Sequence, residues 1–380
     1  LVHADGTADL FTAPEKVTED VVRHLGNAVR IHGYTEFAGA LRNFHGKRIA
    51  ADPDRAVAAI FDALEQGGAR VLTARDPVVL AKAIKNPVEI AGHKAAQERD
   101  GAALARFLKW FEETAPSGDL TELSAAARLL EFRRATGKLL DVSFDTISAT
   151  GRNAAIPHYH VTEESSLPIR PGELYLVDSG GQYFDGTTDV TRVVPVGEPT
   201  AEMKDRFTRV LKGHIGIATA IFPDGTTGAQ IDAFARAPLW RAGLDFAHGT
   251  GHGVGAYLSV HEGPQRIAQP FYPGGAALEP LRAGMFLSNE PGYYKAGEYG
   301  IRIENLVLVK PADIPDAEQA MLAFETLTFV PIEQRLIEPA LLTDEERMWL
   351  NRYHARVLEV LGPQMEGSEL DWLQDKCRPL

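Results

Sequence analysis

Two aspartates, Asp178 and Asp189, stand eleven positions apart in a run of strand-forming and turn-forming residues. The run predicts a strand, a tight turn at Asp185-Gly186 and a returning strand. Such a hairpin would bring the two acidic side chains from neighbouring strands to one place. Because buried carboxylates repel each other unless a cation lies between them, the pair favours a metal site. Asp185 belongs to the turn, so we leave it out of that site.

Three residues farther along the chain could complete such a site, namely His252, Glu290 and Glu304. Glu290 lies in the segment 288–292, where a turn with a solvated glutamate is the simpler interpretation. Glu304 follows Arg302 by two positions, and strand alternation would place both on the same face. A surface pair of Arg302 with Glu304 would explain that spacing equally well.

Histidines are concentrated in the middle of the chain. Six of the 12 fall between residues 158 and 261, and three of these lie in the glycine-rich run 246–264. A histidine among glycines has no core to pack in, and glycine lets a backbone approach a ligand closely. The same glycines formally match a dinucleotide-binding fingerprint. However, the residues that follow, 257–260, are strand-like and open no helix, which argues against a nucleotide site.

The charges of the five candidate ligands point to two metal ions. Four carboxylates and one neutral imidazole carry four negative charges, which two divalent cations would balance. An oxygen-rich set with one nitrogen and no thiolate suits Mn²⁺ and similar ions better than a structural Zn²⁺. Two such ions lower the pKa of a shared water and hold it beside a carbonyl oxygen, which is hydrolytic chemistry. His158, His248 and His261 would then be available for proton transfer and for stabilising a tetrahedral intermediate.

Composition places the chain among ordinary globular proteins. Its 380 residues suffice for two to three domains, and 44% of them are hydrophobic. The formal net charge of −13 argues against nucleic acid or an anionic membrane as a partner. There is neither an apolar run of about 18 residues nor a signal peptide, and the single cysteine, Cys377, fits a reducing compartment. We therefore expect a cytoplasmic protein, and the start without Met suggests a fragment of a longer one.

The secondary-structure signals alternate between helical and strand-rich stretches. Asn86 and Pro87 predict the start of a long helix to about residue 113. Pro238 predicts a kink or an earlier break in a helix over 228–242. The remaining predicted elements are helices at 54–65, from 121, at 200–221 and from the capping box at 343–346, with strands and hairpins over 143–194, 284–294 and 302–309.

With these motifs in order, the chain resembles the aminopeptidase P family of "pita-bread" metallopeptidases, relatives of prolidase and methionine aminopeptidase. The matching motifs are Asp178…Asp189 and the segments 248–255, 260–264, 289–292 and 303–305. The resemblance implies an α+β fold, with a curved, mainly antiparallel sheet flanked by helices in a catalytic domain over 85–320. It also implies a partial, creatinase-N-like α/β domain over 1–84 and a C-terminal extension of the long form over 321–380. Long-form relatives carry two domains ahead of the catalytic one, and only part of one is present here.

The resemblance also implies a role for each matched residue. Asp178 would bind one metal ion with both oxygens, whereas Asp189 and Glu304 would bridge the two ions. His252 and Glu290 would complete the second ion's ligands. The residues matching the family's other site positions are the substrate-contacting histidines His158, His248 and His261 and the basic Arg302 beside the metals. His160 has no counterpart and stays unassigned.

The function implied is a dinuclear aminopeptidase that cleaves the N-terminal Xaa-Pro bond of peptides through a metal-bridging hydroxide. The metals would be Mn²⁺, with Co²⁺ or Zn²⁺ as alternatives, and the partners would be peptides with proline second and a second copy of the chain. Prolidase activity on Xaa-Pro dipeptides is the nearest alternative. A binding module without catalysis and a metal-free hydrolase of the creatinase type are disfavoured, since the five ligands are all present.

Overall fold

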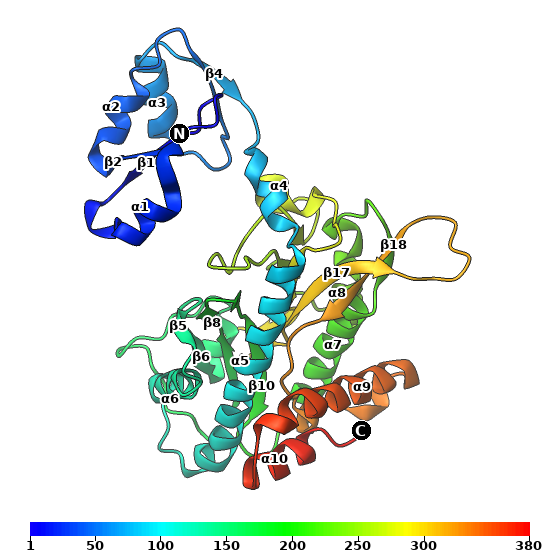
Figure 1. Cartoon of the computed structure of the whole chain (residues 1–380). Coiled ribbons are helices and arrows are strands. Elements are labelled where there is room, and N and C mark those ends of the chain that lie inside the picture. Colours follow the sequence, from blue (N-terminus) through cyan, green and yellow to red (C-terminus); the bar gives the residue numbers. More distant parts are fainter. The chain divides into compact units, whose positions relative to one another are not determined.

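The computed structural model describes residues 1–380, residue 274 by its backbone alone, and divides into two compact units, Leu1–Val78 and Val79–Leu380 (Figure 1). Within the first unit, two parallel strand pairs and three helices surround a small core around Leu41 and Leu64. The strands are β1 (Ala8–Thr12) with β2 (Val29–Gly33) and β3 (Arg48–Ala51) with β4 (Arg70–Thr73), and the helices are α1 (Glu19–Leu25), α2 (Phe37–Leu41) and α3 (Ala58–Gln66). The first unit is therefore α/β, as expected.

The helix predicted from residue 54 begins later, because Asp52 organises a turn ahead of it. The Asp52 carboxylate accepts hydrogen bonds from the backbone N–H groups of Asp54 and Asp76 at 2.9 and 2.8 Å. An aspartate that binds nearby backbone N–H groups favours a turn over a helix. The helix α3 accordingly starts at Ala58.

The helices of the second unit begin close to the predicted positions. Asn86 caps α5 (Pro87–Thr114), and its carboxamide oxygen accepts from the N–H groups of Val88 and Glu89. The others are α4 (Pro77–Ala83, which starts just before the unit boundary), α6 (Glu122–Arg134), α7 (Ala201–Ala218), α8 (Gly228–Trp240), α9 (Asp344–Leu361) and α10 (Ser368–Lys376). Among the described residues, no helix combines the length and apolar character that crossing a membrane would require.

Pro238 does not end its helix, so the predicted break before it is wrong. The helix α8 continues through Pro238 to Trp240. It packs tightly on α7, where a Cβ atom added to Gly213 would lie 2.1 Å from the carbonyl oxygen of Ala235. This close packing stabilises α8 even though Pro238 has no backbone N–H group to donate to the preceding turn.

The strand that contains Asp178 and the strand that Asp189 immediately precedes are neighbours, but they are not joined by the predicted simple hairpin. The strand β7 (Leu174–Ser179) pairs antiparallel with β10 (Val190–Pro195) on one side and with β6 (Ile147–Thr150) on the other. Between β7 and β10, the short strands β8 (Gly181–Tyr183) and β9 (Gly186–Thr187) form a separate hairpin that pairs with β5 (Leu139–Val142). The Asp185-Gly186 turn belongs to this nested hairpin.

A second sheet and two short hairpins complete the second unit. The sheet has the order β11 (Ile221–Pro223), β18 (Met321–Thr326), β17 (Asn305–Ala312) and β14 (Phe286–Asn289). The hairpins are β12 (Gly251–His252) with β13 (Arg266–Ile267) and β15 (Gly292–Lys295) with β16 (Tyr299–Arg302). Every pairing described in residues 79–380 is antiparallel, which agrees with the predicted α+β class.

The segment 257–260 is not the strand that the sequence suggested. Leu258 and Ser259 have φ angles of 61° and 55°, in the left-handed region that interrupts a strand. The chain therefore forms a loop between β12 and β13, and His261 lies on this loop.

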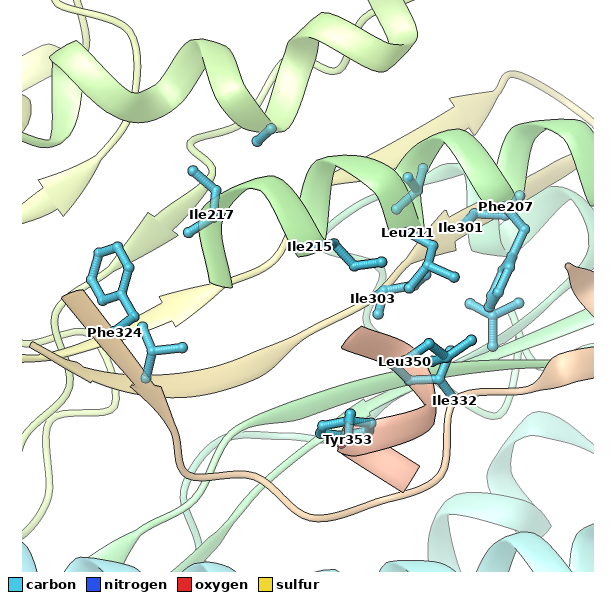
Figure 2. Close-up of a cluster of buried hydrophobic side chains, with 14 of the residues drawn as sticks. Phe207, Leu211, Ile215, Ile217, Ile301, Ile303, Phe324, Ile332, Leu350 and Tyr353 are labelled. Carbon is cyan, nitrogen blue, oxygen red and sulfur yellow. The ribbon is translucent and has the colours of Figure 1, made fainter. Parts of the chain in front are cut away.

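The main core lies between α7, the second sheet and helix α9. Figure 2 shows Phe207, Leu211 and Ile215 on α7 beside Ile301 and Ile303. Two side chains on α9, Leu350 and Tyr353, belong to the same cluster (Figure 2). These contacts hold the strand ends that surround the candidate site.

Candidate metal centre

All nine predicted site residues line one cavity of about 410 Å³ in the second unit. They are Asp178, Asp189, His252, Glu290 and Glu304 as candidate ligands, with His158, His248, His261 and Arg302. Phe144 and Ile147 contribute apolar wall, so the cavity combines a charged floor with an apolar side. Convergent polar groups in an apolar-walled cavity are typical of a binding site.

The two aspartates reach the cavity from the strand pair β7–β10. Asp178 lies opposite Thr191 in this ladder, and Asp189 immediately precedes β10. Arg302 Nη2 donates to Asp178 Oδ2 at 2.5 Å. Asp178 Oδ1 is buried and has no hydrogen-bond partner among the described residues. A buried carboxylate oxygen left open in this way needs a ligand, and a metal ion would provide one.

The two glutamates reach the cavity from the second sheet and its hairpin. Glu290 directly follows β14, and Ser288 Oγ donates to its Oε1 at 3.0 Å. Glu304 lies between β16 and β17, and Thr191 Oγ1 donates to its Oε2 at 2.7 Å. Glu304 is 1% exposed and Arg302 is 3% exposed, so the alternative of a surface ion pair is wrong.

His252 is oriented toward the carboxylates by its own backbone neighbour. Its Nδ1–H donates to the carbonyl oxygen of Gly253 at 3.0 Å, which leaves Nε2 as the free ligand atom. That atom lies 3.4 Å from Asp189 Oδ2 and 3.5 Å from Glu290 Oε1. Ligand atoms of Asp189, His252 and Glu304 lie within 4.8 Å of one another. This spacing fits a metal ion held between them.

Electrostatics in the cluster also favour bound cations. Burial, followed by the charges of Asp189, Asp178 and Glu290, raises the pKa of Glu304 well above its ordinary value. Burial raises the pKa of Glu290 to about 7 and also raises that of Asp189. Burial opposes protonation of His252, but the Asp189 and Glu290 carboxylates outweigh it and raise the pKa of the imidazole. The cluster therefore holds more negative charge than Arg302 can compensate, and divalent ions fit it.

The three other histidines differ in environment. His248 is half-buried, and burial, followed by the Arg302 charge, lowers its pKa to about 3. Its Nδ1–H donates to the carbonyl oxygen of Gly249, so Nε2 accepts from the Tyr294 hydroxyl at 2.8 Å. His261 packs edge-on against His252 with ring centres 4.2 Å apart. His158 is an exposed side chain on the cavity wall.

The profile of metallopeptidase family M24 matches residues 91–311. The chain belongs to metallopeptidase family M24. The C-terminal region of this family matches residues 320–380, and the N-terminal domain of creatinase and prolidase matches residues 1–89. The observed α+β arrangement is thus the pita-bread fold of M24 enzymes preceded by a creatinase-like domain.

Individual relatives of this M24 chain agree with that assignment. Aminopeptidase P2 of Arabidopsis thaliana is 44% identical over 407 residues, covering 98% of this chain and 57% of the relative. A probable Xaa-Pro aminopeptidase P of Laccaria bicolor is 46% identical, covering 86% of this chain and 51% of the relative. The chain therefore spans between half and three fifths of the length of these curated relatives.

Solved structures support the same family assignment. The X-prolyl aminopeptidase of Caenorhabditis elegans, described as a cytosolic enzyme with a di-nuclear active site, superposes with a TM-score of 0.89 at 39% identity. The superposition covers 98% of this chain and 62% of that one. The X-Pro aminopeptidase of Thermotoga maritima and the prolidase of Thermococcus sibiricus match less closely, with TM-scores of 0.68 and 0.67 at 27% and 26% identity. They cover 85% and 86% of this chain, and 84% and 83% of their own chains.

The sequence analysis did not identify two residues of the M24 site, Tyr294 and His214. Arg302 Nη1 donates to the Tyr294 hydroxyl at 2.6 Å, which links Arg302 to His248. His214 on α7 donates from Nδ1 to the carbonyl oxygens of Asn289 and Ile303, at 3.1 and 3.2 Å. Each of these carbonyls adjoins a predicted ligand, so His214 holds two ligand-bearing segments together. The alternation of side chains along the hairpin 292–302 could have indicated that Tyr294 faces the site, whereas no local sequence pattern pointed to His214.

The unassigned His160 lies at the exposed edge of the cavity. Its Nδ1 is 3.9 Å from Asp145 Oδ2, and both side chains are largely exposed. An exposed pair at that distance contributes little to stability. We assign it no role in the chemistry.

Proposed function

We propose that this M24 chain provides the catalytic part of a Xaa-Pro aminopeptidase with two divalent metal ions, most readily Mn²⁺. The observation that carries the proposal is the set of four carboxylates and His252 lining one cavity, with Asp189, Glu290 and Glu304 close to His252 and Asp178 Oδ1 left without a partner among the described residues. The similarity to the C. elegans X-prolyl aminopeptidase supports the same function. The three profile matches support a division into domains at 1–84, 85–320 and 321–380.

Each candidate ligand would contribute in a distinct way. Asp178 would hold one ion, Asp189 and Glu304 would bridge both, and His252 with Glu290 would hold the second. When bound, such ions act as Lewis acids that activate water and polarise the scissile carbonyl. The open Asp178 Oδ1 and the free His252 Nε2 are the atoms best prepared for this binding.

The surrounding residues would orient the substrate and stabilise charge. Arg302 fixes Asp178 through Nη2 and Tyr294 through Nη1, so a single guanidinium joins the carboxylates to the wall that contains His248. His261 is exposed at its edge but partly desolvated in the cavity, and this desolvation, followed by the His252 charge, lowers its pKa to about 4, so the imidazole is neutral near pH 7. A neutral imidazole can donate one hydrogen bond to a developing oxyanion, which is the role we assign to His261. His158 and His248 would contact the substrate beside its proline.

Xaa-Pro-Yaa hydrolysis by the Mn²⁺-loaded chain tests the proposal. We expect release of the N-terminal residue, and its loss after chelation with recovery on adding metal. Cleavage of Xaa-Pro dipeptides alone would instead indicate a prolidase, whose fold the chain also matches. Metal analysis gives an independent check, because a chain that takes up no Mn²⁺, Co²⁺ or Zn²⁺ would contradict the enzyme function. We further propose a homodimer in the cytoplasm, and sedimentation and cell fractionation test these two points.

A further inference from the structure

Arg266 is placed beside the candidate metal centre by strand pairing. It lies on β13, directly opposite His252 on β12. Paired residues of antiparallel strands project to the same face, with Cα atoms about 5 Å apart. The Arg266 side chain accordingly lines the same cavity as the ligand His252.

The Arg266 guanidinium is held against the wall of the cavity by Tyr272. Its Cζ atom lies 4.6 Å from the centre of the Tyr272 ring, and Nη1 donates to the Tyr272 hydroxyl at 3.1 Å. A Cβ atom added to Gly249 would lie 3.3 Å from the same Nη1. Glycine at position 249 therefore leaves room for the arginine, and stacking on the ring restricts its orientation.

Within the part of the chain that the structure describes, the charge of Arg266 is not neutralised. Among the described residues, no carboxylate lies within ion-pair distance of its guanidinium, and Tyr272 is its only hydrogen-bond partner. The other arginine of the cavity, Arg302, is paired with Asp178. A half-buried guanidinium with free N–H donors matches a carboxylate in charge and in geometry.

We propose that Arg266 binds the C-terminal carboxylate of a short substrate, so that the enzyme prefers Xaa-Pro-Yaa tripeptides with a free C-terminus. The inference rests on the proposed function, because it takes the scissile bond to lie at the metal cluster. In an extended tripeptide the terminal carboxylate lies about 7 Å, or two residues, beyond the scissile carbonyl. An arginine one strand away from the ligand His252 is suitably placed to meet it. A cavity of about 410 Å³ has the size of a site for such a small peptide.

The test compares Ala-Pro-Ala with its C-terminal amide, in the wild type and in Arg266→Gln. We expect the wild type to cleave the acid roughly 10- to 100-fold more efficiently, as kcat/KM, than the amide. Arg266→Gln should lose most of this preference through a fall for the acid, with the amide little changed. Arg356→Gln is the matched control, because Arg356 also lies over an aromatic ring, that of Phe329, but outside the cavity. It should keep the wild-type preference.

Binding of the product-like peptide Pro-Ala and of its amide, measured by calorimetry, separates this inference from the proposed function. If the wild type binds the acid more tightly than the amide and Arg266→Gln loses this difference, the proposed role of Arg266 is supported. This holds even if neither tripeptide is cleaved, because an absence of cleavage would count against the proposed function alone. Equal binding and equal cleavage of acid and amide by the wild type would overturn the proposed role of Arg266. A dependence on Arg266 confined to the dipeptide Ala-Pro would also overturn it, because the carboxylate would then lie one residue closer to the metals.

Discussion

Lys85 Nζ donates to Glu262 Oε1 at 2.6 Å and so joins two residues that are 177 positions apart in the chain. Both side chains are buried, and Lys82 Nζ approaches the other carboxylate oxygen at 2.8 Å. Glu262 directly follows His261 on the loop in which Leu258 and Ser259 have left-handed backbone angles. The buried Lys85 thus anchors the loop next to the histidine that faces the metal cluster, whereas Lys82, 53% exposed, adds a weaker contact.

Lys85→Met should lower catalytic activity by disturbing the position of His261. Removing one member of a buried ion pair costs roughly 3 kcal/mol, because Glu262 would then keep only its contact with the exposed Lys82. We expect a lower free energy of unfolding and a roughly 10- to 100-fold fall in kcat/KM, in the range of other residues that orient a site. Urea unfolding and Xaa-Pro-Yaa hydrolysis measure the two effects.

A double-mutant cycle distinguishes positioning from general destabilisation. If Lys85 acts through His261, Lys85→Met should change kcat/KM little when His261→Ala is already present. A full additional loss in that background would contradict the positioning role. Lys82→Met serves as the control, since the Lys82 side chain is 53% exposed and its ion pair should contribute less than about 1 kcal/mol.

The sequence predicted those parts of the molecule that local patterns determine. Asn86 and Thr343 marked helix starts correctly, because capping depends on a few adjacent residues. Asp178 and Asp189 were predicted to lie on neighbouring strands; Asp178 lies on β7, whereas Asp189 lies in the link just before the neighbouring strand β10. The ordered motifs then identified the family, although none of them was decisive alone.

What the sequence could not predict depends on contacts between distant segments. Glu304 seemed equally suited to a surface pair, and its burial arises only when Thr191 of β10 binds it and His214 of α7 contacts the adjacent Ile303. Pro238 stays within a helix because α7 packs closely against it. His214 and Arg266 carry no motif, since their importance comes from the carbonyl groups and the strand partner that the fold places beside them.

Asp189→Asn should abolish metal binding more completely than any other change in the segment 178–189. Asp189 is buried and lies within reach of both His252 and Glu304, so the amide removes a charge shared by the whole cluster. We expect a fall in activity of at least about a hundred-fold, beyond the range typical of residues that only orient ligands. Metal content by mass spectrometry and Xaa-Pro-Yaa hydrolysis check this. Asp185→Asn is the matched control, since Asp185 pairs with Arg99 at 2.8 Å in the nested turn and should leave metal content unchanged.

Glu304→Gln should stabilise the metal-free protein while weakening its response to metal. Without metal, burial and the neighbouring carboxylates raise the pKa of Glu304, so its charged form is unfavourable in the folded chain. A neutral glutamine keeps an oxygen to accept from Thr191 and removes the repulsion, a gain on the order of 1 kcal/mol for each pKa unit. Calorimetry after chelation should show a higher unfolding temperature for the variant. Adding Mn²⁺ should then raise the unfolding temperature less in the variant than in the wild type. A lower unfolding temperature of the metal-free variant, or a larger rise on adding Mn²⁺, would rule out the proposed charge balance.

His354 should make the second unit less stable as the pH falls below about 6.5. Burial, followed by the Arg192 charge, lowers its pKa to about 4, whereas the unfolded chain has the ordinary value near 6.5. Between these values the unfolded state binds a proton that the folded state does not, so stability is lost as the pH falls through this window. At about pH 5 the loss from this one residue is about 2 kcal/mol.

His354→Gln should therefore flatten the pH dependence of unfolding. The glutamine oxygen can accept from the Ile332 N–H in place of the imidazole Nε2, which accepts it at 3.1 Å. We expect the variant to be less stable than the wild type at about pH 7.5, with the difference narrowing by about 2 kcal/mol at about pH 5. Urea unfolding at the two pH values measures this, and the buried His93 and His214, present in both proteins, cancel in the comparison. An equal pH dependence in variant and wild type would contradict the assignment.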